Sequence, residues 1–316
     1  MMFRSLGKSL YFSAAKVFAS AGRLRAIKDN DEAVILNLHR VSPKANPFWP
    51  ELHPDVFRGL LEYLRENFTV GRLNDLASVP KDRPLAILSF DDGYYDFVEY
   101  AVPILKEFDM TANMNVIPTC VETGKPIWNV QLYDFLQSAS REEINAMNIE
   151  GFDKKLNDNS DGSKLAFGMS LSGFLKRRPR AERQEIWRSI EPSVSGRNSG
   201  TRMMNAGEIR QIADFVDIGV HSYSHESMGF EPQEFFTKDF EQCRCFFADN
   251  LELPLDTYAF PNGSYRDEQI TYLRDKGIEH VLLVDEKIAS KSSKAYPRIT
   301  IYGETANEAS MRSLGF

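Results

Sequence analysis

The sequence has few cysteines and no long uninterrupted apolar run. Its 316 residues include three cysteines, and Cys243 and Cys245 are two apart in a stretch of helical character. An odd number of cysteines without a repeated spacing is not a disulfide framework. Helical residues two apart point to different faces, which argues against a metal ion shared by this pair. No segment is long enough for a transmembrane helix, so none is predicted.

The sequence also lacks a basic block, and its net charge is −7. Binding to nucleic acid depends on clustered lysine and arginine, so nucleic acid is not predicted as a partner. The hydrophobic fraction of 42% and charged fraction of 26% are those of a globular protein that can bury a full core. The length allows one large domain or two ordinary ones.

Residues 1–32 form a distinct N-terminal part of the sequence. Residues 1–25 hold five basic residues and no acidic residue, and no long apolar run or cleavage site predicts a secretory signal. The absence of such a signal favours a cytoplasmic location. We expect a basic amphipathic helix whose apolar residues are Leu6, Leu10, Ala14, Val17 and Phe18. Such a helix either packs on the domain or makes peripheral contact with an anionic membrane surface.

Strands and helices are predicted to alternate along most of the remaining chain. The β-rich runs are 33–38, 85–90, 112–117, 217–220, 257–260, 281–284 and 297–301. Helical segments between them predict an α/β protein with about seven parallel strands in a sheet or barrel. Residues 124–215 interrupt this rhythm and are predicted to be a mostly helical insertion. The core domain would then consist of residues 33–123 and 216–316.

Two short motifs lie about 130 residues apart, each after a predicted strand. The first contains Asp91, Asp92 and Gly93, and the second contains His221 and His225. Taken singly, Asp-Asp-Gly is a common turn and a histidine pair is often structural. Functional side chains of parallel α/β folds collect at the carboxyl ends of strands, where both motifs are expected. One aspartate and two histidines can hold a divalent metal, which leaves the other aspartate as a base.

These motifs resemble those of the NodB-type polysaccharide deacetylases, carbohydrate esterase family 4. The family's motifs Thr-Phe-Asp-Asp-Gly and His-Ser/Thr-x-x-His are similar to residues 89–93 and 221–225. Residues 258–263 resemble its third motif, an aromatic residue leading to Pro-aromatic-Gly. The resemblance extends from about residue 33 to residue 301, with the insertion between its two parts.

The resemblance implies a deformed (β/α) barrel and removal of N-acetyl groups from an N-acetylated sugar, in a polysaccharide or a glycan precursor. Asp92, His221 and His225 would bind the metal, usually zinc, with cobalt, nickel or iron as alternatives. Asp91 would be the general base, and the backbone amide of Asn262 would contact the oxyanion. The metal centre would equally serve a hydrolase of a small amide or an O-acetyl ester. A protein of another class, an inactive metal- or glycan-binding protein, also fits.

The sequence departs from the family pattern at four places: Ser89 replaces threonine, Asn262 stands where an aromatic residue is usual, and two further departures concern catalytic residues. The third motif usually carries an arginine that orients the base, and that place falls near Ala259. The C-terminal Leu-x-His motif, which supplies the general acid, is not evident, and His280 precedes its strand instead of following it. His39 ends the first predicted strand and resembles the histidine of deacetylases with a permuted motif order. His39 is therefore the candidate general acid, with a structural histidine as the alternative.

Four aromatic residues and one basic run complete the candidates. The residues expected to stack on a sugar are Tyr94, Tyr95, Trp49 and Trp128, although such aromatics are as often packing residues. The run 176–180 is predicted to be a solvated loop, with contact to a pyrophosphate as the alternative. The sequence leaves the oligomeric state and the role of the insertion open.

Overall fold

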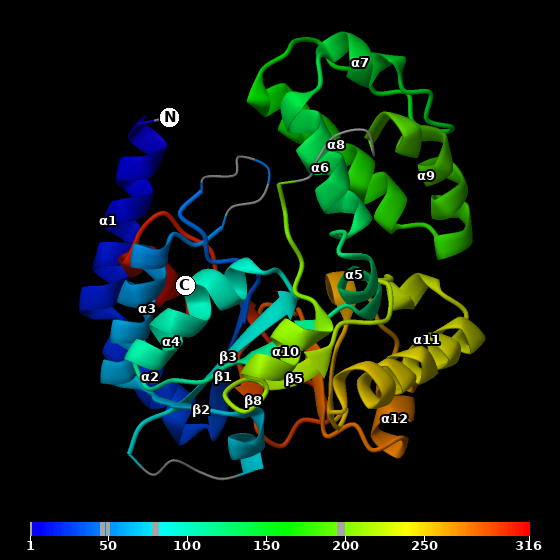
Figure 1. Ribbon diagram of the computed structural model, residues 1–316. Helices are drawn as coiled ribbons and strands as arrows, with labels where there is room; N and C mark the ends of the chain where they lie inside the picture. The colour runs from blue at the N-terminus through cyan, green and yellow to red at the C-terminus, as the bar shows by residue number, and fades with distance from the viewer. Residues whose placement is uncertain (1, 45–47, 49–50, 78–81, 195–199) are drawn as a thin grey trace.

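The computed structural model describes residues 2–44, 48, 51–77, 82–194 and 200–316, with the backbone alone for residues 2–6 and 8–10. Among the described residues, no helix is long and apolar enough to cross a membrane. The chain folds around one large sheet, with a helical lobe above it (Figure 1).

Ten strands in the described part of the chain form this sheet, in the order β10-β1-β3-β4-β5-β6-β7-β9, with β2 beside β3 and β8 beside β1. The strands are β1 (Glu32–Leu38), β2 (Thr69–Gly71), β3 (Leu85–Asp92), β4 (Asn113–Val116), β5 (Asp217–Val220), β6 (Thr257–Ala259), β7 (His280–Leu283), β8 (Ala289–Ser290), β9 (Tyr296–Pro297) and β10 (Ile299–Thr300). Every pair is parallel except β1 with β8. The two ends of the order, β9 and β10, are separated by Arg298 alone, so the sheet is a nearly closed barrel. The predicted deformed (β/α) barrel is confirmed.

The strands are buried on both faces because their apolar residues alternate between two cores. In β1 and β3, Ala33, Ile35, Leu85 and Ile87 belong to a small cluster with residues of β6, β7 and β9. Their neighbours at even positions pack in the large cluster that includes the surrounding helices. Near-continuous apolar runs are the pattern of parallel strands covered on both sides.

Helices surround the barrel. They are α1 (Met2–Phe18), α2 (Ser20–Asp29), α3 (Pro54–Asn67), α4 (Val102–Glu107), α5 (Pro118–Thr123), α10 (Ala206–Ile212), α11 (Gln233–Phe246), α12 (Asp267–Asp275) and α13 (Ala306–Arg312). Short 3₁₀ segments lie at η1 (Leu73–Ala77), η3 (Met228–Phe230) and η5 (Pro261–Gly263), and π-helical turns at η2 (Phe97–Ala101) and η4 (Phe247–Leu251). Pro54 begins α3 at the first helical position, which suits proline because its missing N–H would have no partner within the helix there.

The lobe above the barrel is built from α6 (Trp128–Ser138), α7 (Arg141–Ala146), α8 (Asp161–Lys176) and α9 (Arg180–Val194) (Figure 1). These helices have a hydrophobic core of their own, separate from the barrel core. Ser160 caps α8 by accepting a hydrogen bond from the Ser163 amide. The polar segment 157–163 therefore contains the start of a long helix.

The N-terminal segment is two helices instead of one, and it packs on the domain through residues that the sequence did not single out. Phe12 and Ala15 are buried, and α1 lies against α13. Val17 is 73% exposed and Phe18 is 87% exposed, so these two do not form the packed face. Leu6 and Leu10 have side chains outside the described part of the structure.

Candidate active site

The two aspartates of the first motif end β3 inside the barrel. All eight residues of β3 are buried, and the strand continues to Asp92. Successive residues of a strand normally point to opposite faces. Asp92 has a φ of 78°, and Gly93 follows with a φ of 82°. Both carboxylates consequently lie beside one histidine: His221 Nε2 is 3.8 Å from Asp91 Oδ2 and 3.7 Å from Asp92 Oδ1.

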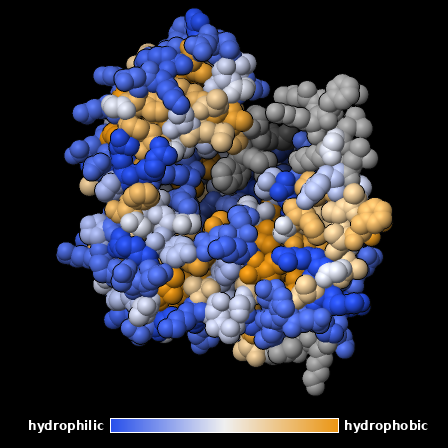
Figure 2. All heavy atoms as spheres, turned by 180° about the vertical axis from the view of Figure 1, so that it is seen from behind, coloured by the Kyte–Doolittle hydropathy of each residue, from blue (hydrophilic) through white to orange (hydrophobic). Residues whose placement is uncertain are grey.

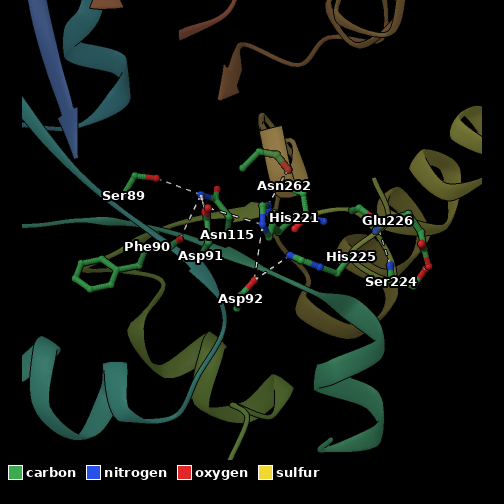
Figure 3. Close-up of polar contacts among 12 residues, drawn as sticks. Ser89, Phe90, Asp91, Asp92, Asn115, His221, Ser224, His225, Glu226 and Asn262 are labelled. Atoms are coloured by element: carbon green, nitrogen blue, oxygen red, sulfur yellow. Dashed lines mark hydrogen bonds and ion pairs between the residues drawn. The ribbon is translucent and has the colours of Figure 1, made fainter. Parts of the chain in front are cut away.

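The two histidines come from the loop that follows β5 (Figure 3). The segment is a turn and not a helix, and Ser222 and His225 both have positive φ values, near 60°. A residue other than glycine in this region costs about 1–3 kcal/mol and persists only where its surroundings hold it. Among these surroundings is Asp239 of α11, which accepts hydrogen bonds from the Tyr223 amide and the Ser222 hydroxyl.

Asp92, His221 and His225 form a group that fits a divalent metal. Their ligand atoms all lie within 4.8 Å of one another, and His225 Nε2 is 3.5 Å from Asp92 Oδ1. Tetrahedral zinc with bonds of about 2.0–2.1 Å holds its ligand atoms roughly 3.4 Å apart. Among the described residues, none donates a hydrogen bond to the buried Asp92 Oδ1, as expected of an oxygen that coordinates a cation. The donor set and spacing therefore suit zinc or a similar ion.

The histidines are in the protonation state that a metal ligand requires. His221 Nδ1 lies 2.9 Å from the carbonyl oxygen of Ala259, which can only accept, so this nitrogen carries the proton and Nε2 faces Asp92. Burial lowers the pKa of His221 and His225, so both imidazoles are neutral near pH 7.

Asp91 is held by Arg298, a residue that the sequence did not indicate. Arg298 Nη1 and Nη2 donate to the two carboxylate oxygens of Asp91, each at 2.8 Å, and both side chains are almost fully buried. Arg298 lies at the seam between β9 and β10, and its Nε donates to the Leu283 carbonyl. The family usually places an arginine at the position near Ala259, and here Arg298, close to the C-terminus, contacts the candidate base instead. No local motif surrounds Arg298, so only the closure of the barrel reveals it.

The Asp91 carboxylate is ionised in this environment. Burial alone would raise its pKa, but the charge of Arg298 and the Arg298 hydrogen bonds hold it well below its usual range. Asn115 of β4 adds a hydrogen bond from Nδ2 to Asp91 Oδ1 at 2.8 Å. The carboxylate is therefore available as a proton acceptor over the whole neutral range.

His39 lies on the same side of the barrel, at the end of β1. Burial lowers its pKa, while the charges of Asp92 and Asp91 act in the opposite direction. The ring is thus within electrostatic range of both aspartates. Asn262 lies in the loop after β6, three residues beyond the carbonyl that binds His221, and Figure 3 shows it near that ring. His280, in contrast, bonds Asn74 at the opposite end of the sheet.

The four aromatic candidates differ in their placement. Tyr94 is only 1% exposed and is covered by the Arg40 guanidinium, 4.8 Å from its ring centre, so it is not a stacking surface. Tyr95 is half-buried, with Arg202 3.4 Å from its ring centre. Trp128 is half-buried and packs edge-on against Trp187 in the lobe. Trp49 lies outside the described residues.

The basic run 176–180 is only in part the solvated loop that the sequence predicted: residues 177–179 connect α8 and α9 and Arg177 is exposed, whereas Lys176 and Arg180 belong to the two helices. Lys176 is the last residue of α8, and it is half-buried. Its ammonium interacts electrostatically with Asp92, His221 and His225. The lobe therefore brings a positive charge close to the candidate metal site, which no sequence signal could show.

A cavity of about 570 Å³ lies between the barrel edge and the lobe. Its lining includes Arg40, the residue after His39, together with Tyr95, Asp96 and Asp134. Seen from behind, the surface is hollowed below the upper lobe (Figure 2). The volume is within the range of small-molecule sites.

Comparisons with known proteins agree with this geometry. Residues 194–281 match the family described as polysaccharide deacetylase. A search of curated proteins finds no match. The fold is similar to that of Streptococcus pyogenes deacetylase PplD in complex with acetate, with 16% identity, a TM-score of 0.59, and coverage of 90% of this chain and 98% of that one.

The chain resembles the polysaccharide deacetylases. IcaB from Ammonifex degensii has the same fold, with 14% identity, a TM-score of 0.56, and coverage of 90% and 97% of the two chains. A de-N-acetylase from Aggregatibacter actinomycetemcomitans follows with 14% identity, a TM-score of 0.54, and coverage of 87% and 96%. The resemblance inferred from the motifs is thereby confirmed. The segment that matches the polysaccharide deacetylase family contains the histidine motif and the third motif, but not the Asp-Asp-Gly motif.

Proposed function

We propose that this protein is a metal-dependent hydrolase that removes N-acetyl groups from an N-acetylated sugar. The observation that carries the proposal is the pairing of two functions at one site. Asp92, His221 and His225 are spaced for a divalent metal, and Asp91 is a buried base beside them that Arg298 holds. A protein that only bound metal would have no need of this second, separately stabilised carboxylate.

The residues divide the reaction among themselves. A bound divalent metal, most simply zinc, supplies a Lewis acid that polarises the acetamide carbonyl and makes water more acidic. The Asp91 carboxylate accepts the proton of the attacking water, which its low pKa allows throughout the neutral range. His39 delivers a proton to the departing amine, and the Asn262 amide donates a hydrogen bond to the carbonyl oxygen as negative charge develops on it.

The substrate assignment rests on the cavity and on the structural relatives. The cavity lined by Arg40 and Tyr95 has room for a sugar ring, and Tyr95 is the described aromatic candidate on its wall. The relatives include a deacetylase solved with acetate, which is the expected second product here. An N-acetylated sugar in a polysaccharide or a glycan precursor is the substrate class that joins these observations.

The test is acetate release from a matched panel of N-acetyl and O-acetyl sugars, supplied free, nucleotide-linked and polymeric. Asp91→Asn is expected to lower kcat at least 100-fold at unchanged metal content, because it keeps the shape of the side chain and removes the base. Glu62→Gln, an exposed carboxylate on α3 outside the lining of the cavity, is the control and is expected to keep full activity. Stoichiometric metal binding without acetate release from any substrate would refute the proposal, and release from O-acetyl sugars alone would change the substrate class.

We further propose that the N-terminal helix makes peripheral contact with an anionic membrane. Three exposed apolar residues lie on α1: Tyr11, Val17 and Phe18. All charged residues within residues 1–25 are basic. Aromatic and basic residues on one exposed helix are typical of interfacial binding. Sedimentation with vesicles of anionic or neutral lipid tests this. Binding that is lost in Val17→Ser/Phe18→Ser supports the contact, and equal sedimentation with both vesicle types contradicts it.

A further inference from the structure

The strained histidine loop is joined to the helical lobe through one residue, Glu226. Glu226 directly follows His225 and is only 1% exposed. Arg183 of α9 donates from Nη2 to Glu226 Oε1 at 2.7 Å, and its Nη1 lies 2.6 Å from Oε2. Arg180 of the same helix approaches Glu226 Oε1 to 3.3 Å. The carboxylate next to a candidate metal ligand is thus gripped by two arginines of the lobe.

The ion pair is a built feature of the lobe. The Arg183 side chain is only 7% exposed, and its guanidinium lies 5.5 Å from the Trp128 ring centre. The Arg180 backbone amide donates a hydrogen bond to Glu231 Oε1, which is a second contact between the lobe and the barrel. A buried arginine–carboxylate pair that combines one hydrogen bond with a second close charge contact fixes both position and orientation.

The ion pair between Arg183 and Glu226 is linked to the rest of the histidine loop through the backbone of Glu226. The Glu226 amide donates to the Ser222 hydroxyl at 3.2 Å, which closes the loop from Ser222 to Glu226. The Ser222 hydroxyl in turn donates to Asp239 of α11. His225, with its positive φ, therefore lies between an anchor in the barrel and an anchor in the lobe.

We propose that Arg183 is a positioning residue for the metal centre: through Glu226 the helical lobe holds the His225 loop in its ligating conformation. The lobe is thus part of the active centre and not an independent addition to the barrel. This inference rests on the metal site of the proposed function, and it assigns the lobe a role in assembling that site.

The test measures metal affinity and loop mobility, and it needs no turnover. Zn²⁺ is titrated into metal-free full-length protein in competition with a chelating dye, and amide hydrogen exchange of residues 221–226 is followed without metal. Arg183→Met is expected to raise the Kd for Zn²⁺ about 10–100-fold, the usual effect of losing an outer partner of a metal ligand, and to speed exchange of the Glu226 amide. Arg188→Met, an exposed arginine on the same helix, is the control and should change neither.

Glu226→Gln keeps the shape of the side chain and covers the case in which Arg183→Met does not fold. A folded variant of either kind whose Kd for Zn²⁺ stays within twofold of wild type would overturn the inference, even if its thermal stability fell. The outcome is independent of the substrate. Absence of acetate release in the wild type would refute the proposed function, while a zinc affinity that depends on Arg183 would still support the positioning role.

Discussion

Replacing Arg298 by methionine would leave Asp91 buried without its counter-charge. Both side chains are almost fully buried, and the pair is bidentate with two contacts of 2.8 Å. Removing one partner of a buried ion pair costs about 3–5 kcal/mol, because the remaining charge has lost both water and partner. We therefore expect Arg298→Met to lower the free energy of unfolding at pH 7 by that amount.

The same change would move the ionisation of Asp91. An opposite charge this close lowers a carboxyl pKa by about 1–3 pH units, and hydrogen bonds to the carboxylate lower it further. Arg298→Met removes both influences, so burial becomes the main one and raises the pKa of Asp91 above its ordinary value, although Asn115 still donates a hydrogen bond. The folded variant would bind a proton more tightly than the unfolded chain, so its stability should rise as the pH falls from 7 towards 5. In the wild type the folded pKa is lowered, and Asp91 contributes stability that is lost only in acid, below its unfolded pKa of about 3.9.

The assays are urea unfolding and kcat/KM for acetate release, each between pH 5 and pH 8. In Arg298→Met the acid side of the kcat/KM profile should move to higher pH, while the wild type shows no loss attributable to Asp91. Arg298→Lys keeps the charge without the two-pronged contact, so it should give intermediate stability. An Arg298→Met protein with wild-type stability and an unchanged profile would refute the role assigned to this pair.

Three further predictions concern the same site. His39→Ala should lower kcat by about 10²–10⁴-fold. It should also abolish the decline of kcat with rising pH that deprotonation of His39 causes. If the pH profile of the variant were unchanged, His39 would be excluded as the general acid. Lys176→Met should reduce kcat/KM but tighten Zn²⁺ binding several-fold, since it removes a positive charge near the metal ligands. Competition with a chelating dye measures the Kd for Zn²⁺, and a higher Kd in the variant would contradict this prediction. Chelation should abolish acetate release and Zn²⁺ should restore it in the wild type but not in His225→Ala; activity that survives chelation and dialysis would contradict the metal dependence.

Much of the barrel could be predicted from local pattern. The strand at 85–90 and the helix begun by Pro54 appear where the apolar pattern and the proline place them. Local pattern succeeds here because β3 is buried on both faces and α3 buries one face. It failed where pattern and packing diverge: α8 begins at Asp161 within a polar segment, and the N-terminal helix packs through Phe12 instead of Val17 and Phe18.

The candidate site was accessible from sequence only where its residues lie in contiguous motifs. Two motifs are recognisable in the sequence, one with Asp91 and Asp92 and one with His221 and His225. Each motif follows a strand, and the carboxyl ends of parallel strands lie at one edge of the sheet. Tyr94 shows the limit of that reasoning. Its neighbour Tyr95 lines the cavity, whereas Tyr94 itself is covered by Arg40, and a sequence does not show which side of a turn faces a cavity.

The sequence by itself determined the class of fold and the residue types of the candidate metal ligands and candidate base. Tertiary structure alone decided what surrounds them. Arg298 reaches Asp91 because the barrel closes at the seam between β9 and β10, 207 residues from the carboxylate that it holds. Arg183 reaches Glu226 because the lobe folds back over the strand ends. Such contacts follow from closure and docking of whole elements, which depend on the summed packing of many residues and leave no signal in the sequence around any one of them.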